Sequence, residues 1–390
     1  MDYSAVVPVY NGEKYIVRTL LSLLGQRHPP MEIIVVDDGS TDGTAGILRD
    51  MAKACNRLRI HSLDENGGVS RARNAGIEKA AAPWCLLFDA DDLADPDLAA
   101  VYAKEWTATR REGREPDMMF CATIQIDGED RVIGGEHRFR PVAPDEMLGY
   151  LFVRNPIVSC SGVMVRRDAV LSLGGFDPAL RYSEDWDLWL RMAHSHDIRY
   201  VDRVLCRIRR HGGNASSSIG RMLSGERQVL SRYDLSFIKA ALFRRRVPAS
   251  RNWIDLAAIA FRLDRWEEGL HYLERADEPS SSLDFYKGLY HLQAGRHGEA
   301  AEWFFRAMRK DEGHAAAANN YAGCMLMLGR KEEAAALLKE LTRAWPAYMD
   351  AARNLRLALP EGGDESPPSV RFTWRELRSV LTVYDEKETD

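Results

Sequence analysis

Over the first 90 residues, continuous apolar runs alternate with stretches whose apolar residues recur every three or four positions. The apolar runs predict strands, and the amphipathic stretches predict helices between them. In chain order, the expected strands are 5–9, 32–36, 58–61 and 84–88, and the expected helices are 13–24, 41–55 and 69–80. Strands that are apolar throughout and separated by helices are typical of a parallel sheet covered on both faces.

The pattern changes twice further along the chain. Residues 91–235 are more mixed, with strands expected at 118–126 and 162–166. The charged run Arg244–Arg246 is interpreted as a solvated linker, and beyond it the periodicity is purely helical. The chain is thus expected to combine an α/β domain with an all-α domain.

The helical half repeats itself. The segment Gly295–Ala301 resembles Gly329–Ala335, which lies 34 residues later, and a weaker copy runs through 264–269. This period, with small and aromatic residues at matching positions, resembles tetratricopeptide helix pairs, three of which would bury a continuous core. An irregular helical bundle is the alternative.

These patterns define the expected organisation. The fold class is a Rossmann-like, mostly parallel α/β domain followed by an all-α tetratricopeptide-like domain. The α/β domain is expected at 1–235, a linker at 236–251, the helical repeats at 252–360, and a linker and tail at 361–390, with a short helix at 374–381.

Composition narrows the class of protein. A hydrophobic content of 45% and a charged content of 28% are ordinary for a soluble globular chain, and a net charge of −5 gives no general attraction for nucleic acid. The six cysteines show no Cys-x-x-Cys spacing, which fits a reducing compartment. No apolar run reaches the length of a membrane span, and the start does not resemble a signal peptide. We therefore expect a cytoplasmic protein, with peripheral membrane association left open.

Polar clusters follow three of the predicted parallel strands. They are Tyr10–Gly12 after the first strand, Asp37–Ser40 after the second, and Asp89–Asp92 after the fourth. Ligands of parallel α/β sheets bind outside the carboxyl ends of the strands. The three clusters are therefore expected to meet in one crevice.

The acidic cluster contains three carboxylates, Asp89, Asp91 and Asp92, which repel one another unless a cation lies between them. A magnesium or manganese ion prefers oxygen ligands and is commonly bound together with a diphosphate. The alternative is a helix start capped by Asp92 or Asp95, which accounts for one carboxylate but not for three. The cluster predicts a divalent-cation site.

Seven segments, taken together, resemble the family-2 glycosyltransferases, which have the GT-A fold. In family order they are VVPVYNGEKYI, VVDDGSTDGT, ENGGVSRARNAGI, LLFDADD, SGVMVRRDAV with GGFD, YSEDWDLWLR and RRHGGNAS. They cover about 230 residues. The resemblance implies inverting transfer of a sugar from a nucleotide diphosphate donor.

The resemblance also implies a nucleotide-sugar site made of Pro8, Tyr10, Asp38, Arg73, Asp89 and Ala90. Tyr10 would stack on the base or simply pack in the core. Asp38 would accept a base imide N–H, which favours uracil or thymine, with a uridine diphosphate donor expected, whereas Asp37 would cap its own turn. Arg73 is preferred to Arg71, for which a surface salt bridge to Glu65 or Glu78 is the alternative.

For catalysis the resemblance points to the segment that begins the helix at 184. Asp185 matches the general base of the family, and Glu184 would tune its pKa or contact the acceptor, with helix capping by Ser183 and Glu184 as the alternative. Asp91 is expected to bind the metal directly, with His211 as a further ligand.

The expected reaction is therefore transfer of one sugar to an acceptor hydroxyl or thiol. The Q-x-x-R-W signature of processive synthases is absent from the sequence. The repeats are expected to serve a peptide or protein acceptor, or a homodimer. The alternatives are a surface-polysaccharide or glycolipid glycosyltransferase whose repeats serve only assembly, and an inert scaffold. A nucleotidyltransferase is disfavoured, since its glycine-rich loop is absent after the first strand.

Overall fold

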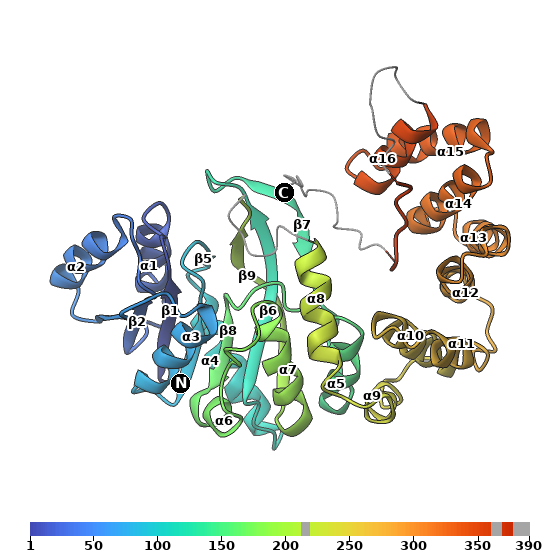
Figure 1. Cartoon of the computed structure of the whole chain (residues 1–390). Helices are drawn as coiled ribbons and strands as arrows, with labels where there is room; N and C mark the ends of the chain where they lie inside the picture. Colours follow the sequence, from blue (N-terminus) through green and yellow to red (C-terminus); the bar gives the residue numbers. More distant parts are fainter. Residues whose placement is uncertain (212–218, 360–368, 377–390) are drawn as a thin grey trace. The chain divides into compact units, whose positions relative to one another are not determined.

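The computed structural model describes residues 1–211, 219–359 and 369–376 (Figure 1). The chain forms two compact units, Met1–Arg232 and Tyr233–Asp390. All strands in the described part of the chain belong to the first unit, and the described part of the second unit is helical apart from its connections and its last segment.

A nine-stranded sheet forms the centre of the first unit, in the order β3-β2-β1-β4-β8-β6-β9-β5, with β7 beside β6. The four strands at its start, which pair in parallel, are β1 (Tyr3–Val9), β2 (Glu32–Asp37), β3 (Leu58–Ser62) and β4 (Trp84–Leu87). They match the strands expected from the apolar runs. The GT-A-type α/β fold is thus confirmed for this half of the chain.

Both faces of β1, β2 and β4 are covered, which explains why these three strands are mostly apolar, whereas β3 at the edge of the sheet is partly exposed. The odd-numbered residues of β1 pack with Ile16 and Leu20 of α1 (Ile16–Leu24). On the opposite face, Val6 lies against Gly76 of α3 (Val69–Lys79), where an added Cβ would come within 2.4 Å of the Val6 side chain. A side chain at position 76 would therefore separate α3 from the sheet.

The helix expected at 41–55 is shorter than predicted, since α2 spans Thr44–Ala54. The reason is a turn in which Asp42 Oδ1 accepts the Thr44 backbone N–H at 3.0 Å and Glu13 Oε2 accepts that of Gly43 at 2.7 Å. Asp side chains compete in this way with helical backbone hydrogen bonds.

The rest of the sheet is mixed. β4 and β6 both pair antiparallel with β8, whereas β6 pairs in parallel with β9, a long strand that the sequence did not predict. These strands are β5 (Leu93–Ala94), β6 (Met118–Ile126), β7 (Val132–His137), β8 (Val163–Arg166) and β9 (Ile198–Arg209). The helices between and after them are α4 (Leu98–Arg111), α5 (Pro144–Val153), α6 (Arg167–Ser172), α7 (Glu184–Ser195) and α8 (Ile219–Leu230).

The second unit is a series of helix pairs. Its helices are α9 (Leu235–Leu242), α10 (Ala249–Arg262), α11 (Trp266–Leu273), α12 (Ser281–Gln293), α13 (His297–Lys310), α14 (Ala315–Met327), α15 (Lys331–Ala344) and α16 (Met349–Ala358). From α12 onward each helix packs on the next, and one core cluster extends from α10 to α16. The continuous core confirms the repeat interpretation over an irregular bundle.

The three copies share their turn chemistry. The turns before α11, α13 and α15 contain Asp264, Gly295 and Gly329, all with positive φ between 58° and 79°. In each copy the next residue is an Arg that pairs with the Glu three positions later. Small residues then let the helices approach: an added Cβ on Gly288 would lie 2.6 Å from the Phe304 ring. The repeated sequence pattern thus encodes a repeated turn and packing contact.

Three expectations for the second half of the chain need correction or qualification. The expected linker at 236–251 contains α9. Arg245, interpreted as solvated, is 5% exposed and pairs with buried Asp255 at 2.7 Å. Trp374–Glu376, the described start of the expected helix at 374–381, is not helical, and the rest of that helix, together with 361–368, lies outside the described residues.

Candidate functional site

The carboxyl ends of β1, β2 and β4 meet at one edge of the sheet, as the sequence predicted. Val9 pairs with Asp37, and the Phe88 backbone N–H donates to the Val6 carbonyl at 3.0 Å. Pro8 is buried within β1, whereas Tyr10, just beyond it, is 49% exposed. Core packing is therefore excluded for Tyr10, and its ring is available to a ligand.

The two aspartates after β2 hold two different loops. Asp37 Oδ1 accepts the Ser40 backbone N–H at 3.0 Å, which confirms the predicted turn cap. Asp38 accepts the backbone N–H groups of Gly67 and Gly68 at 2.9 and 2.8 Å. Asp38 therefore fixes the loop before α3, and each of its oxygens keeps a second lone pair for a ligand.

Arg73 lies at the centre of the site and is 5% exposed. Its Nη1 donates to Glu184 Oε1 and its Nη2 to Asp89 Oδ1, both at 2.8 Å. The guanidinium also lies over the Phe176 ring, 5.2 Å from the centroid. Arg73 thus joins the end of β4 to the start of α7. Arg71, by contrast, is half exposed and 3.7 Å from Glu65, as its salt-bridge alternative predicted.

The next residue, Asn74, ties α3 to the glycine-rich turn after α6. Its amide accepts the Phe176 backbone N–H and donates to the Phe176 carbonyl, each at 2.8 Å. Gly175 has φ +70°, and an added Cβ there would lie 2.5 Å from Asn74 Oδ1. The Arg73–Asn74 pair therefore positions both sides of the crevice.

Asp92 does not cap a helix, which corrects one alternative from the sequence. Asp97 is the N-cap residue of α4, and Asp95 accepts the Asp97 backbone N–H. Asp92 is 2% exposed and binds the Arg209 backbone N–H at 2.7 Å and the Ser161 hydroxyl at 2.5 Å. Burial, with Asp91 and Asp89 nearby, raises the pKa of Asp92 well above its usual range.

Asp91, unlike Asp92, pairs with a histidine side chain. Its Oδ2 lies 2.9 Å from Nε2 of His211, and their side chains are 26% and 30% exposed. His211 also stacks on Tyr15, with ring centroids 5.3 Å apart. The structure thus brings together the two residues predicted as metal ligands, although Gly212–Asn214 of the same motif lie outside the described residues.

Asp185 lies next to the Arg73 ion pairs. Its Oδ1 accepts the Trp186 backbone N–H at 2.7 Å, and its Oδ2 accepts from Asn155 at 3.3 Å. Burial, followed by the charge of Glu184, raises the pKa of Asp185 to about 7, although Arg73 opposes the rise. Such a carboxylate can take up a proton near neutral pH. Ser183 makes no side-chain cap, so the capping alternative is not supported for that residue.

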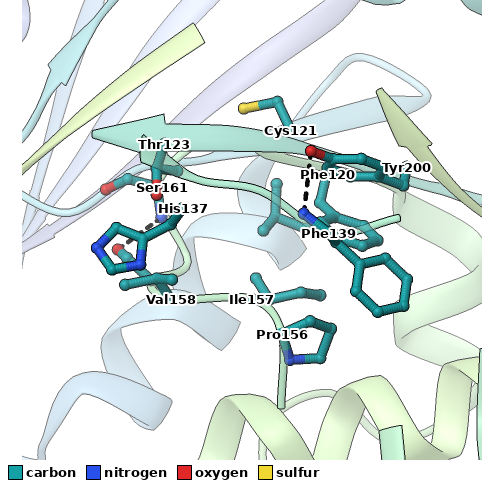
Figure 2. Close-up of a pocket in the computed structure, with 12 residues that line it drawn as sticks. Phe120, Cys121, Thr123, His137, Phe139, Pro156, Ile157, Val158, Ser161 and Tyr200 are labelled. Atoms are coloured by element: carbon teal, nitrogen blue, oxygen red, sulfur yellow. Dashed lines mark hydrogen bonds between the residues drawn. The ribbon is translucent and has the colours of Figure 1, made fainter. Parts of the chain in front are cut away.

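A small pocket lined by both apolar and polar side chains adjoins the carboxylates. Figure 2 shows Phe120 of β6 on the side of the strand where Pro156, Ile157 and Val158 lie, with Tyr200 of β9 alongside, whereas the Cys121 side chain points to the other side. The Phe139 backbone N–H donates to the Tyr200 hydroxyl at 3.1 Å. Ser159 and Ser161 line this pocket and also bind Asp89 and Asp92, so the pocket and the charged site share a wall.

Four residues of this network were not assigned contacts from the sequence. They are Asn155, Ser159, Ser161 and Arg209. Ser161 carried a signal, since it is the first residue of the SGVMVRRDAV segment that resembles the family. Arg209 is fully buried, and its Nε donates to the Asp91 carbonyl at 2.7 Å. The carbonyls of Asp91 and Asp127, to which its side chain donates, lie 118 and 82 residues away in sequence, so no local pattern predicts these contacts.

The fold and the charged crevice define a GT-A glycosyltransferase, and the comparisons identify its family. The Glycosyl transferase family 2 model matches residues 4–174, and a Tetratricopeptide repeat model matches 291–359. TuaG of Bacillus subtilis (strain 168), a glycosyltransferase named for teichuronic acid biosynthesis, is 31% identical over 192 residues, which are 48% of this chain and 71% of TuaG. The chain belongs to glycosyltransferase family 2.

A further relative agrees with this assignment, and a solved structure agrees with the fold. An uncharacterised glycosyltransferase of Haemophilus influenzae is 27% identical over 222 residues, 55% of this chain and 67% of that protein. The crystal structure of S. aureus TarS 1-349 superposes with a TM-score of 0.51 at 17% identity, covering 80% of this chain and 93% of that one. At such identity the TarS match supports the fold alone.

Among residues 1–211, 219–359 and 369–376, no helix is both long enough and apolar enough to cross a bilayer.

Proposed function

We propose that this chain transfers one sugar, with inversion, from a uridine diphosphate sugar to a hydroxyl of a glycan acceptor. The observation that carries the proposal is the arrangement around Arg73. One buried cation holds Asp89 of the nucleotide side and Glu184 of the catalytic helix at 2.8 Å each. Asp185, with its raised pKa, lies next to Glu184.

The donor side would be built from the strand ends. Exposed Tyr10 would stack on the base, and Asp38 would accept the imide N–H that uracil carries, beside the loop amides that it already fixes. Asp89, 28% exposed, would reach the ribose hydroxyls with the oxygen lone pairs that Arg73 and Ser159 leave unused. Pro8 and Ala90 would shape the backbone beneath the nucleotide.

Asp185 would act as the general base. The acceptor oxygen attacks the anomeric carbon on the face opposite the diphosphate, the bond from that carbon to the diphosphate oxygen breaks, and the acceptor proton moves to the Asp185 carboxylate. A pKa of about 7 suits this role, because about half of the carboxyl groups are ionised at neutral pH and the ionised form is basic enough to take a proton. Asn155 and the amino end of α7 would orient the carboxylate.

The residues present fit a divalent cation. Asp91 Oδ2 and His211 Nε2 are 2.9 Å apart and partly exposed, and a hard ion could take both together with diphosphate oxygens and water. Within the described ranges no three candidate ligands cluster, so diphosphate oxygens and water would have to supply the remaining ligands. When bound, manganese or magnesium would offset charge on the departing diphosphate.

The names of similar proteins favour a glycan acceptor. TuaG is named for biosynthesis of teichuronic acid, and a chondroitin synthase of Escherichia coli is 25% identical over 213 residues, 55% of this chain and 29% of the synthase. TarS 1-349 has also been solved in complex with UDP-GlcNAc, and that structure superposes with a TM-score of 0.50 at 20% identity, covering 84% of this chain and 92% of that one. These names support a uridine donor and a polymeric sugar acceptor for this chain.

Calorimetric titration of the full chain with UDP, GDP and ADP, with and without manganese, tests the proposal. We expect UDP to bind most tightly and manganese to strengthen that binding. Asp91→Ala should lose the manganese-dependent part, whereas Asp168→Ala, which removes a carboxylate that is 87% exposed on α6, should not. Binding of none of the three nucleotides at millimolar concentration would favour the inert scaffold instead.

A further inference from the structure

The segment Val370–Glu376 lies in an extended conformation along the repeat helices (Figure 1). Its backbone is paired with asparagine side chains. Asn354 accepts the Arg371 N–H at 2.8 Å and donates to the Arg371 carbonyl at 2.7 Å, and Asn320 does the same for Thr373 at 2.7 and 2.8 Å. Two side-chain amides thus bind alternate residues of an extended chain, in the manner of a neighbouring strand.

A third asparagine completes the groove. Asn319 donates to the Arg371 carbonyl at 3.0 Å and accepts from Asn354 at 2.9 Å. All three asparagines are fully buried, on α14 and α16. A buried amide without hydrogen-bond partners is destabilising, so three of them in an apolar repeat need a partner with N–H and C=O groups. An extended peptide backbone supplies both.

The side chains of the segment also have prepared places. An added Cβ on Gly323 would lie 2.6 Å from the Phe372 ring, so the glycine makes room for that ring, which also stacks against His297. Trp374 contacts Trp266 edge-on, with centroids 5.9 Å apart. The Thr373 hydroxyl donates to Asp350 at 2.8 Å. The groove therefore accommodates an aromatic, hydroxyl, aromatic sequence.

The far end of the groove carries positive charge. Glu376 lies 4.0 Å from Arg251 on α10 and 3.6 Å from His314 before α14, and it accepts a hydrogen bond from Ser282 on α12. Burial acts to raise the pKa of Glu376, but the hydrogen bonds with His314 and Ser282 and the charge of Arg251 together outweigh it and lower the pKa. An acidic residue three positions after the bound hydroxyl residue is thus favoured.

We propose that this groove is a peptide-binding site and that residues 370–376 occupy it as an internal ligand that another protein chain displaces. The partner is an extended segment with a Ser or Thr between aromatic residues, followed by an acidic residue. Displacement is feasible because the backbone pairs with Asn320 and Asn354 can be made by any residue except proline. Trp374, 45% exposed, is only partly enclosed. The proposal is independent of the sugar donor.

The test uses the full chain and a fluorescein-labelled peptide of sequence SVRFTWRE, which copies residues 369–376. A tethered ligand has an effective concentration on the order of millimolar, so the wild-type groove should bind the labelled peptide weakly. The variant Phe372→Ala/Trp374→Ala weakens the internal ligand only, and we expect at least tenfold tighter peptide binding. Adding Asn320→Ala to that variant should abolish the gain.

Two control peptides separate backbone recognition from side-chain recognition. The T373P peptide lacks the N–H that Asn320 accepts and should not bind, whereas the T373A peptide keeps it and should lose only a few-fold in affinity. Equal binding of all three peptides would overturn the backbone pairing.

A second measurement needs no variant. Amide hydrogen exchange of residues 370–376 in the wild-type chain should accelerate when several millimolar unlabelled peptide is added. Unchanged exchange there, or a chain that unfolds when Phe372 and Trp374 are replaced, would mean that the segment is a fixed part of the repeat fold, and would overturn the proposal. A dimer that the peptide dissociates would also overturn it, since the segment would then bind a second copy.

Discussion

The sites proposed in the two units of this protein are built with opposite chemistry. In the transferase unit, a buried arginine holds two carboxylates, and a third carboxylate beside them has its pKa raised to about 7. In the repeat unit, three buried asparagines, all neutral, pair with an extended backbone. The clustered charges of the first site suit proton transfer. The neutral amides of the second site pair with a peptide backbone, whatever most of the side chains of that peptide are.

The largest expected effect is on turnover. Asp185→Asn should lower the rate of nucleotide-sugar turnover about 10²–10⁴-fold, because the amide cannot accept the acceptor proton. UDP affinity should change less than about twofold, since no donor contact is assigned to this side chain. UDP release measured beside calorimetry gives both values, with exposed Asp168→Asn as the matched control. Wild-type turnover in Asp185→Asn would show that another group is the base.

The next effect is on stability. Arg73→Met leaves Asp89 and Glu184 without their shared cation and should cost about 3–5 kcal/mol of unfolding free energy. Arg71→Met, two residues away and half exposed, should cost less than about 0.5 kcal/mol. Urea unfolding of the two variants measures the difference. A similar loss of unfolding free energy in both variants would contradict the claim that Arg73 stabilises the site through its two ion pairs.

The raised pKa of Asp185 also predicts a pH-dependent stability. The folded state keeps this proton up to about pH 7, whereas the unfolded state loses it near its pKa of 3.8. The free energy of unfolding of the wild type should therefore fall as the pH rises from about 4 to about 7. Asp185→Asn does not ionise, so its stability relative to wild type should rise with pH, by up to about 4 kcal/mol at pH 8. Thermal melting at pH 4.5 and 8 tests the sign. A difference that does not change with pH would argue against the shift.

The smallest expected effect is a difference in how salt changes the affinities for UDP and for the peptide. Raising ionic strength from about 0.01 to about 1 M shortens the Debye length from about 30 to about 3 Å. UDP binding should weaken several-fold, whereas the SVRFTWRE peptide should lose less, because its backbone pairs are neutral and only its Glu376 end meets positive charge. Equal salt dependence would remove the proposed contrast.

Features that depend on a short stretch of chain could be predicted from the sequence. The apolar runs indicated the parallel strands, and the rule that ligands bind at strand ends placed Tyr10, Asp38 and Asp89 at one edge before their contacts were known. The 34-residue period indicated the repeats. In each case a short stretch of chain contains the whole physical signal.

Features that depend on distant partners could not be predicted in this way. Arg73 pairs with residues 16 and 111 positions away, and Asp92 binds a backbone N–H 117 positions away, so it was wrongly offered as a helix cap. Arg245 looked like part of a solvated charge run because its partner Asp255 becomes a neighbour only in the fold. The pairing of Arg371 and Thr373 with asparagines likewise requires two separate helices to be in place.

The dependence of turnover on pH tests the central claim most directly. With the nucleotide sugar that calorimetry identifies, kcat/KM of the wild-type chain should fall about tenfold per pH unit below about 7 and level off above it, because only ionised Asp185 can accept the proton. A rate that stays flat from pH 5 to pH 8, with the chain folded throughout, would contradict the assignment of Asp185 as the base.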